Sequence, residues 1–124
     1  MGSTIEINDD FMTLKSIKEQ FNAKFPHLKI EFFETKHDEG EASAKELMYD
    51  DAFRIKDIRK EGAMIPISIH GNLKTSTLEK LFEEELGVFI QVYKKSKNVW
   101  IQTTATDDWT LSQQEKDMLE EEIE

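Results

Sequence analysis

The side chains best suited to chemistry are three histidines, His27, His37 and His70, because the chain has no cysteine. The most ligand-like cluster is His37-Asp38-Glu39, which sets an imidazole beside two carboxylates. No H-E-x-x-H or H-x-H pattern brings two histidines to the spacing of a metal site. The cluster lies in a polar stretch without periodicity, so a solvated charged loop is the better interpretation. We expect no metal ion and no cofactor.

His70 is the second candidate for chemistry. It follows an expected strand and precedes Gly71, a kind of junction where catalytic side chains often lie. A small hydrolase-like enzyme that uses His70 or His37 with carboxylates is therefore one alternative function. The competing interpretation is a turn histidine with a local hydrogen bond. The sequence contains neither a glycine-rich phosphate motif nor a nucleophile elbow, so it favours a protein without catalytic activity.

The most specific surface feature is aromatic. Tyr93, Trp100, Gln102 and Thr104 are expected on one face of a hairpin, with lysines around its turn. Tyrosine and tryptophan are frequent anchors in protein interfaces. If this face is open, it is suited to peptide or protein contacts. If a helix covers it, Trp100 belongs to the core, and the need of the helices for a sheet face slightly favours the core.

These residues depend on the stretch from Gly87 to Thr104, which alternates apolar and polar residues twice around the turn Lys95 to Asn98. Such alternation predicts a β-hairpin. Its other face is apolar and is expected to face the core: Val88, Ile90, Val92, Val99, Ile101 and Thr103.

Three helices are expected, over about 13–25, 76–86 and 112–122, because apolar residues recur there at spacings of three and four. Ser76 with Glu79, and Ser112 with Glu115, match the capping box that opens a helix. Gly87 stands where a C-cap glycine belongs.

The order strand, helix, strand occurs twice, over about 5–32 and 67–92. Two βαβ-like halves suggest a ferredoxin-like arrangement. We therefore expect a single α+β domain over residues 1–124. Its mostly antiparallel sheet has about four or five strands, with helices packed on it and a further helix at the C-terminus.

Three segments are less regular. Residues 35–43 are polar and are expected to form an exposed loop, and residues 44–60 are ambiguous apart from a short helix near 55–60. The apolar face of the last helix is thin, so residues 120–124 are expected to fray.

The formal net charge is −10, from 26 acidic and 16 basic residues. Nucleic acid and anionic membrane surfaces are poor partners for such a chain, since both favour clustered positive charge. A basic protein is a more suitable partner. No apolar run approaches the roughly 20 residues that span a bilayer, so we expect a cytoplasmic protein.

Part of the chain resembles a known family. The stretch T-L-E-K-L-F-E-E-E-L-G, followed by I-Q-V-Y-K-K-S-K-N-V-W-I-Q-T-T-A-T-D-D-W-T-L, is similar to a family of small uncharacterised bacterial proteins. The similarity covers about residues 65–115. It implies a bacterial origin and one small α+β domain, and it carries no catalytic or ligand residues. Ser96-Lys97-Asn98 stands where the family has Ser-Gly-Asn, and this replacement of glycine by lysine bears on the type of turn that the hairpin forms.

The function expected from these observations is a non-enzymatic protein-binding or adaptor module. A more specific alternative is an acidic immunity-type inhibitor of a basic toxin, because charge complementarity lets a small acidic domain block a basic active site.

Overall fold

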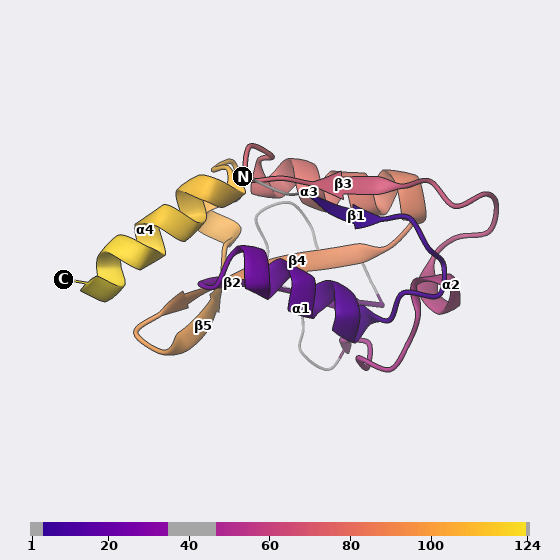
Figure 1. The fold of residues 1–124 in the computed structure, drawn as a ribbon, viewed down its shortest axis with the longest axis horizontal. Coiled ribbons are helices and arrows are strands. Elements are labelled where there is room, and N and C mark those ends of the chain that lie inside the picture. Colours follow the sequence, from indigo (N-terminus) through magenta and orange to yellow (C-terminus); the bar gives the residue numbers. More distant parts are fainter. Residues whose placement is uncertain (1–3, 35–46, 124) are drawn as a thin grey trace.

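Two short isoleucine-rich strands form the first sheet. The computed structural model describes residues 4–34 and 47–123 (Figure 1). In it, β1 (Ile5–Ile7) pairs antiparallel with β3 (Ile67–Ile69). The isoleucines of both strands are buried, while the exposed Ser68 hydroxyl donates a hydrogen bond to the Glu6 carboxylate. Alternating apolar and polar residues thus give a sheet with one buried face.

The second sheet has three antiparallel strands in the order β2 (Leu28–Phe33), β4 (Phe89–Ser96) and β5 (Val99–Gln102). The expected α+β class, antiparallel strands and β4–β5 hairpin are confirmed. The described strands belong to two small sheets instead of one. Each βαβ-like half contributes one strand to each sheet, so β1 pairs with β3, and β2 pairs with β4.

The helices are α1 (Leu14–Lys24), α2 (Ile55–Ile58), α3 (Thr75–Leu81) and α4 (Leu111–Ile123). The first of these begins as its cap predicts: the Thr13 hydroxyl accepts a hydrogen bond from the Ser16 N–H at 3.1 Å. Helix α1 packs on β2, and α4 packs on β4 (Figure 1). The C-terminal helix is regular up to Ile123, and fraying of this end stays a prediction.

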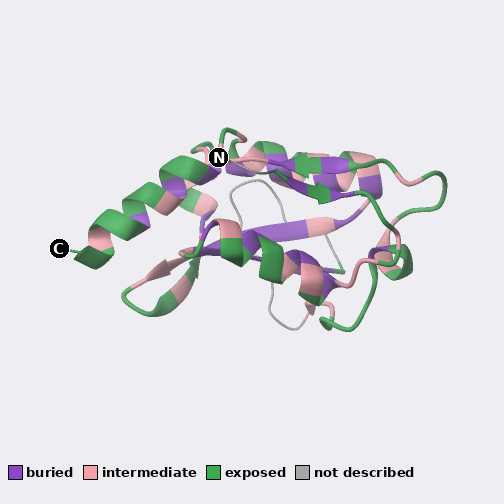
Figure 2. Cartoon of the chain, viewed as in Figure 1, coloured by how far each residue is buried: buried purple, intermediate pink, exposed green. Residues whose placement is uncertain are grey.

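One hydrophobic core joins both sheets and the helices. The rings of Phe32 on β2 and Phe82 after α3 meet edge to face, with centroids 5.9 Å apart. Figure 2 shows that β4 is buried along its first half, whereas β5 and much of α4 are exposed or half-buried. The largest fully buried side chains are Phe21, Phe32, Phe33, Phe82, Ile7, Leu14, Ile17, Leu28, Ile30, Ile55, Ile67 and Ile69.

Helix α3 widens into a π-helical turn, Phe82–Leu86, before it ends. Lys60 donates hydrogen bonds to two carbonyls of this turn: its backbone N–H donates to Leu86 O at 2.7 Å, and its Nζ donates to Glu84 O at 2.6 Å. Gly87 ends the helix with φ at +66°, which confirms the expected C-cap. The π-helical turn was not expected, because the residue that satisfies it lies far away in the sequence.

The expected capping boxes are wrong for both later helices. Helix α3 begins at Thr75 because the segment before α4 supplies carbonyl acceptors: Thr75 N–H donates to Trp109 O at 2.8 Å and Ser76 N–H to Asp107 O at 2.6 Å. At α4, Thr110 and Gln113 cap each other instead of Ser112 and Glu115. At α3, backbone contacts with a distant segment thus replace the expected side-chain cap, whereas at α4 a local side-chain cap forms two residues before the expected one.

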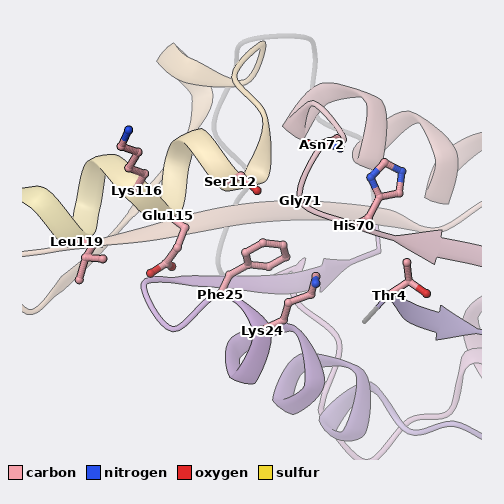
Figure 3. A pocket seen from close by; sticks show the side chains of 10 residues that line it. All are labelled: Thr4, Lys24, Phe25, His70, Gly71, Asn72, Ser112, Glu115, Lys116 and Leu119. Atoms are coloured by element: carbon pink, nitrogen blue, oxygen red, sulfur yellow. The ribbon is translucent and has the colours of Figure 1, made fainter. Parts of the chain in front are cut away.

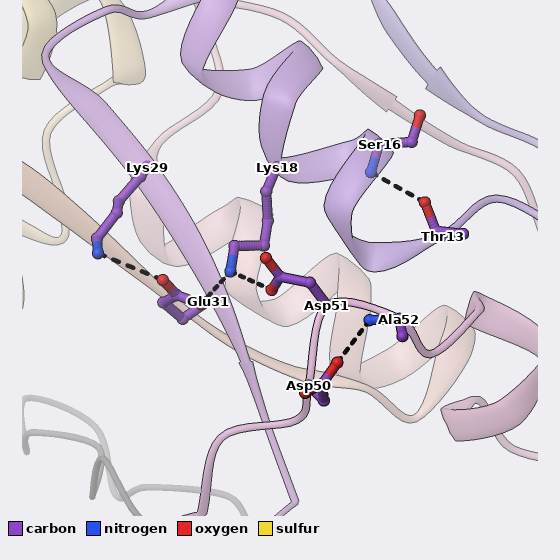
Figure 4. A network of polar contacts seen from close by, with 8 residues as sticks. All are labelled: Thr13, Ser16, Lys18, Lys29, Glu31, Asp50, Asp51 and Ala52. Atoms are coloured by element: carbon purple, nitrogen blue, oxygen red, sulfur yellow. Dashed lines mark hydrogen bonds and ion pairs between the residues drawn. The ribbon is translucent and has the colours of Figure 1, made fainter.

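Lys18 ties α1 to two other segments. Its Nζ lies 2.6 Å from both Glu31 Oε1 on β2 and Asp51 Oδ1 (Figure 4). Lys29 Nζ approaches the second oxygen of Glu31 at 3.3 Å. The Glu31 carboxylate is almost buried, so these two lysines provide the positive charge that it needs there.

The hairpin turn consists of Lys97 and Asn98, with φ angles of 49° and 66°. Two positive φ angles in a two-residue loop define a type I′ turn, which matches the twist of the flanking strands. The chain therefore keeps a tight turn although lysine stands at the first position.

The cluster His37-Asp38-Glu39 and the expected loop 35–43 lie outside the described residues. Within the part that the structure covers, no helix has the length and apolar character needed to cross a membrane.

Candidate functional site

The hairpin face that the sequence singled out is formed by cross-strand pairs. Tyr93 on β4 pairs with Gln102 on β5, and Lys95 pairs with Trp100. The Tyr93 hydroxyl lies 3.4 Å from Gln102 Nε2. Tyr93 is buried and Trp100 is half-buried. This face is therefore neither fully open to solvent nor fully covered by a helix.

A lysine lies against both rings. Lys29 Nζ on β2 is 5.2 Å from the Tyr93 ring centroid and 5.1 Å from that of Trp100. Burial raises the pKa of the Tyr93 hydroxyl, and the nearby Glu31 carboxylate adds to this. The three side chains Lys29, Tyr93 and Trp100 thus form a cation–π cluster on this face.

Thr104 does not belong to this face of the hairpin. It opens a short 3-10 helix, Thr104–Thr106, after β5 has ended at Gln102. Between them, the Thr103 hydroxyl is buried and donates to Val92 O at 3.0 Å. Thr103 therefore does face the core as expected, and of the four predicted binding residues the hairpin brings together Tyr93, Trp100 and Gln102.

The expectation that Val99 and Ile101 face the core is wrong, since 58% and 41% of their surfaces are exposed. The reason is the register of the pairing. Strand β5 pairs only with the Tyr93–Ser96 end of β4, whereas the core residues of β4 precede Tyr93. The outer strand therefore extends beyond the core.

A separate pocket of about 590 Å³ lies where the end of α1, the turn after β3 and the first turns of α4 meet (Figure 3). At Gly71 the backbone of the turn after β3 comes close to the start of α4: the Gly71 carbonyl accepts a hydrogen bond from Ser112 N–H at 3.0 Å. A Cβ atom at Gly71 would lie 2.0 Å from Ser112 Oγ. A side chain there would force Ser112 to move.

His70 lines this pocket, and so does the carboxylate of Glu115. In the view of Figure 3 the Phe25 ring lies between them. Glu115 is already engaged by His27, whose backbone N–H and Nδ1 donate to its two oxygens at 2.7 and 2.6 Å. No hydrogen bond joins the His70 imidazole to any residue in the described ranges. The hydrolase-like alternative therefore stays a prediction: the His70 imidazole is not oriented by a carboxylate, and His37 lies outside the described residues.

His27 was not singled out by the sequence, yet it has more polar contacts than His70, the other histidine that the structure describes. Besides Glu115, its Nε2 contacts the Glu122 carboxylate on α4. The hydrogen bonds from Glu115 and Glu122 raise the pKa of His27 above its ordinary value. A protonated His27 thus fastens the turn before β2 to α4.

This contact predicts a pH dependence of stability. Because the pKa of His27 is higher in the folded than in the unfolded state, its contribution is complete below the unfolded value of about 6.5 and disappears as pH rises through the raised folded value. We expect His27→Gln to destabilise the protein at pH 6 and to cost much less at pH 9, in urea unfolding at each pH. Glu115→Gln should lower the pKa of His27 in an NMR titration. An unchanged pKa would contradict the contact.

No group of three or more histidine or acidic side chains gathers as a metal site within residues 4–34 and 47–123. Comparisons with protein-family models, curated proteins and solved structures find no match to this chain.

Proposed function

We propose that the chain is a non-enzymatic protein-binding module that contacts its partner through the outer strand β5. The supporting observation is the exposure of Val99 and Ile101 on one face of a strand with Trp100 on the other. Large apolar side chains on an outer strand are typical of places where proteins meet.

The backbone of β5 supports the same proposal. One edge of β5 pairs with β4, and the other pairs with no strand among the described residues. Such an edge presents N–H and C=O groups that can pair with a strand of another protein. Val99 and Ile101 would then supply apolar contacts beside the backbone hydrogen bonds.

The charge around this strand suggests the kind of partner. Of the carboxylates on α4, Glu121 and Glu122 lie beside the hairpin, where they line a hollow together with Lys95 and Lys97, and the chain as a whole carries −10. A basic partner would be attracted to them, although Lys94 and Lys95 make the hairpin itself locally positive. An immunity-type inhibitor of a basic toxin is a narrower form of this proposal, supported by net charge alone. A cytoplasmic location and membership of the bacterial family resembled above are parts of the same proposal.

A matched pair of variants tests this function. Ile101 on β5 and Ile65 in the loop before β3 are equally exposed, at 41% each, so replacing either with lysine changes charge and apolar area alike. We expect affinity capture from native lysate at low salt, analysed by mass spectrometry, to recover a basic partner with the wild type and Ile65→Lys. Ile101→Lys should lose it, and high salt should weaken it.

Two results would overturn the proposal. Capture of no partner at either salt concentration would remove the binding function. Retention of the partner by Ile101→Lys, with circular dichroism showing both variants folded, would place the contact away from β5.

A further inference from the structure

Helix α4 is attached unevenly to the rest of the fold. Its buried residues all lie in its first part: Leu111, Gln114 and Met118. In the outer end of α4, residues 119–123, Leu119 is 45% and Ile123 75% exposed, and Figure 2 shows this end of the helix largely open to solvent. Little apolar burial therefore holds the outer end in place, and polar contacts have to supply the attachment.

Two side-chain contacts link the outer end to other elements in the described part of the chain. The Ser96 hydroxyl at the end of β4 donates to Glu121 Oε1 at 2.5 Å, and Nε2 of His27 contacts the Glu122 carboxylate. The second contact depends on an imidazole, the side chain that gains or loses its charge near neutral pH. One of the two attachments can therefore be removed by a modest change of pH.

The geometry at His27 requires a charged ring. Nδ1 lies 2.6 Å from Glu115 Oε2, and Nε2 contacts Glu122, so a carboxylate lies at each ring nitrogen. A neutral imidazole carries only one N–H and would turn a lone pair towards the second carboxylate. Glu115 also accepts the backbone N–H of His27 at 2.7 Å, and its side chain is less exposed than that of Glu122, at 18% against 63%. Loss of the ring proton therefore falls mainly on the contact with Glu122.

The other charged groups near His27 are lysines. Lys95 of β4 donates its backbone N–H to His27 O at 2.8 Å, but its Nζ lies against Trp100, 5.9 Å from the ring centroid. Lys24 is the last residue of α1 and precedes His27 by three positions. The hydrogen bonds from the two carboxylates of α4 outweigh the remaining influences and raise the pKa of the imidazole.

We propose that His27 is a pH-sensitive switch: loss of its ring proton releases the outer end of α4 from the hairpin and from the turn before β2, while the rest of the chain stays folded. Release alters a hollow of about 530 Å³ between the hairpin and α4, lined by Lys95, Lys97, Asn98, Met118, Glu121 and Glu122. Its two carboxylates leave with the outer end, whereas its two lysines stay on the hairpin. The hollow therefore changes from a balanced to a positive charge as pH rises. This inference does not depend on the protein contact proposed for β5.

Methyl spectra of the full chain, labelled with ¹³C at methionine and isoleucine methyl groups, test the switch. Met118 and Ile123 report on the end of α4, and the fully buried Ile7 of β1 reports on the core. Between about pH 6 and pH 9 we expect the first two signals to move towards the shifts of an unstructured chain. Their midpoint should equal that of the His27 ring signal, and Ile7 should not change.

His27→Gln cannot change its charge and should abolish the transition, whereas His70→Gln, at the other described histidine, should retain it. Glu122→Gln alters a largely exposed side chain, so it keeps the switch testable if His27→Gln fails to fold. It should move the midpoints of the His27 ring and of Met118 to lower pH together. The proposal is overturned if Met118 and Ile123 do not move while His27 loses its proton, if Ile7 moves with them, or if His27→Gln keeps the transition.

Discussion

Replacing Phe32 with alanine is expected to lower the free energy of unfolding by about 3–5 kcal/mol. Phe32 lies on β2, only 1% of its surface is exposed, and its ring packs edge to face on Phe82 at the end of α3. The substitution removes apolar area from the core and leaves a cavity where the two βαβ-like halves meet. Urea unfolding followed by circular dichroism measures the loss.

The matched control is Phe11→Ala. Phe11 is 61% exposed and lies against Arg54 and Lys56, so we expect a loss of about 1 kcal/mol or less. Similar losses for Phe32→Ala and Phe11→Ala would show that the Phe32–Phe82 contact is not part of the core.

The sequence predicted the local elements well because their patterns are local. Leu14, Ile17 and Phe21 recur at helical spacing, and all three are buried on α1. The alternation on either side of Lys97 and Asn98 predicted the β4–β5 hairpin, and Gly87 predicted the end of the preceding helix. Each of these signals lies within a few residues of the element that it defines.

The arrangement of the elements was harder to predict. Alternation shows that Val99 and Ile101 share a face, but not that β5 extends past the core and exposes them. In the same way, Ser76 has the residue type of a helix cap, yet α3 begins one residue earlier because the carbonyls of Asp107 and Trp109 accept its first N–H groups. Contacts between segments about 30 residues apart leave no pattern in the local sequence.

The two candidate sites differ in the same respect. Tyr93, Trp100 and Gln102 were predicted to lie together because they belong to one hairpin with a period of two. The pocket was missed, because Lys24, His70 and Lys116 come from three distant segments that only the fold brings together. The glycine after His70 was the one local signal, since a close approach of backbone is a common reason for glycine in a turn.

The position of α4, and with it one wall of the pocket, depends on a buried glutamine. Gln114 is fully buried, and its Nε2 donates to Thr106 O at 2.7 Å and to Thr75 Oγ1 at 3.2 Å. Its Oε1 accepts a hydrogen bond from the Thr106 hydroxyl at 3.0 Å. One side chain thus links the start of α4 to the start of α3 and to the turn after β5.

Gln114→Ala is therefore expected to lower the free energy of unfolding by about 2–4 kcal/mol, since it removes the hydrogen-bond partner of the Thr106 hydroxyl and of the Thr106 carbonyl and creates a small cavity. Gln20→Ala removes the same amide from an exposed position of α1, where it bonds only to Ser16, and should cost about 0.5 kcal/mol or less. Hydrogen exchange should also quicken at Leu111 and Ser112, whose N–H groups bond to the turn after β3. Equal losses for the two alanine variants, with unchanged exchange at Ser112, would mean that Gln114 does not hold α4 in place.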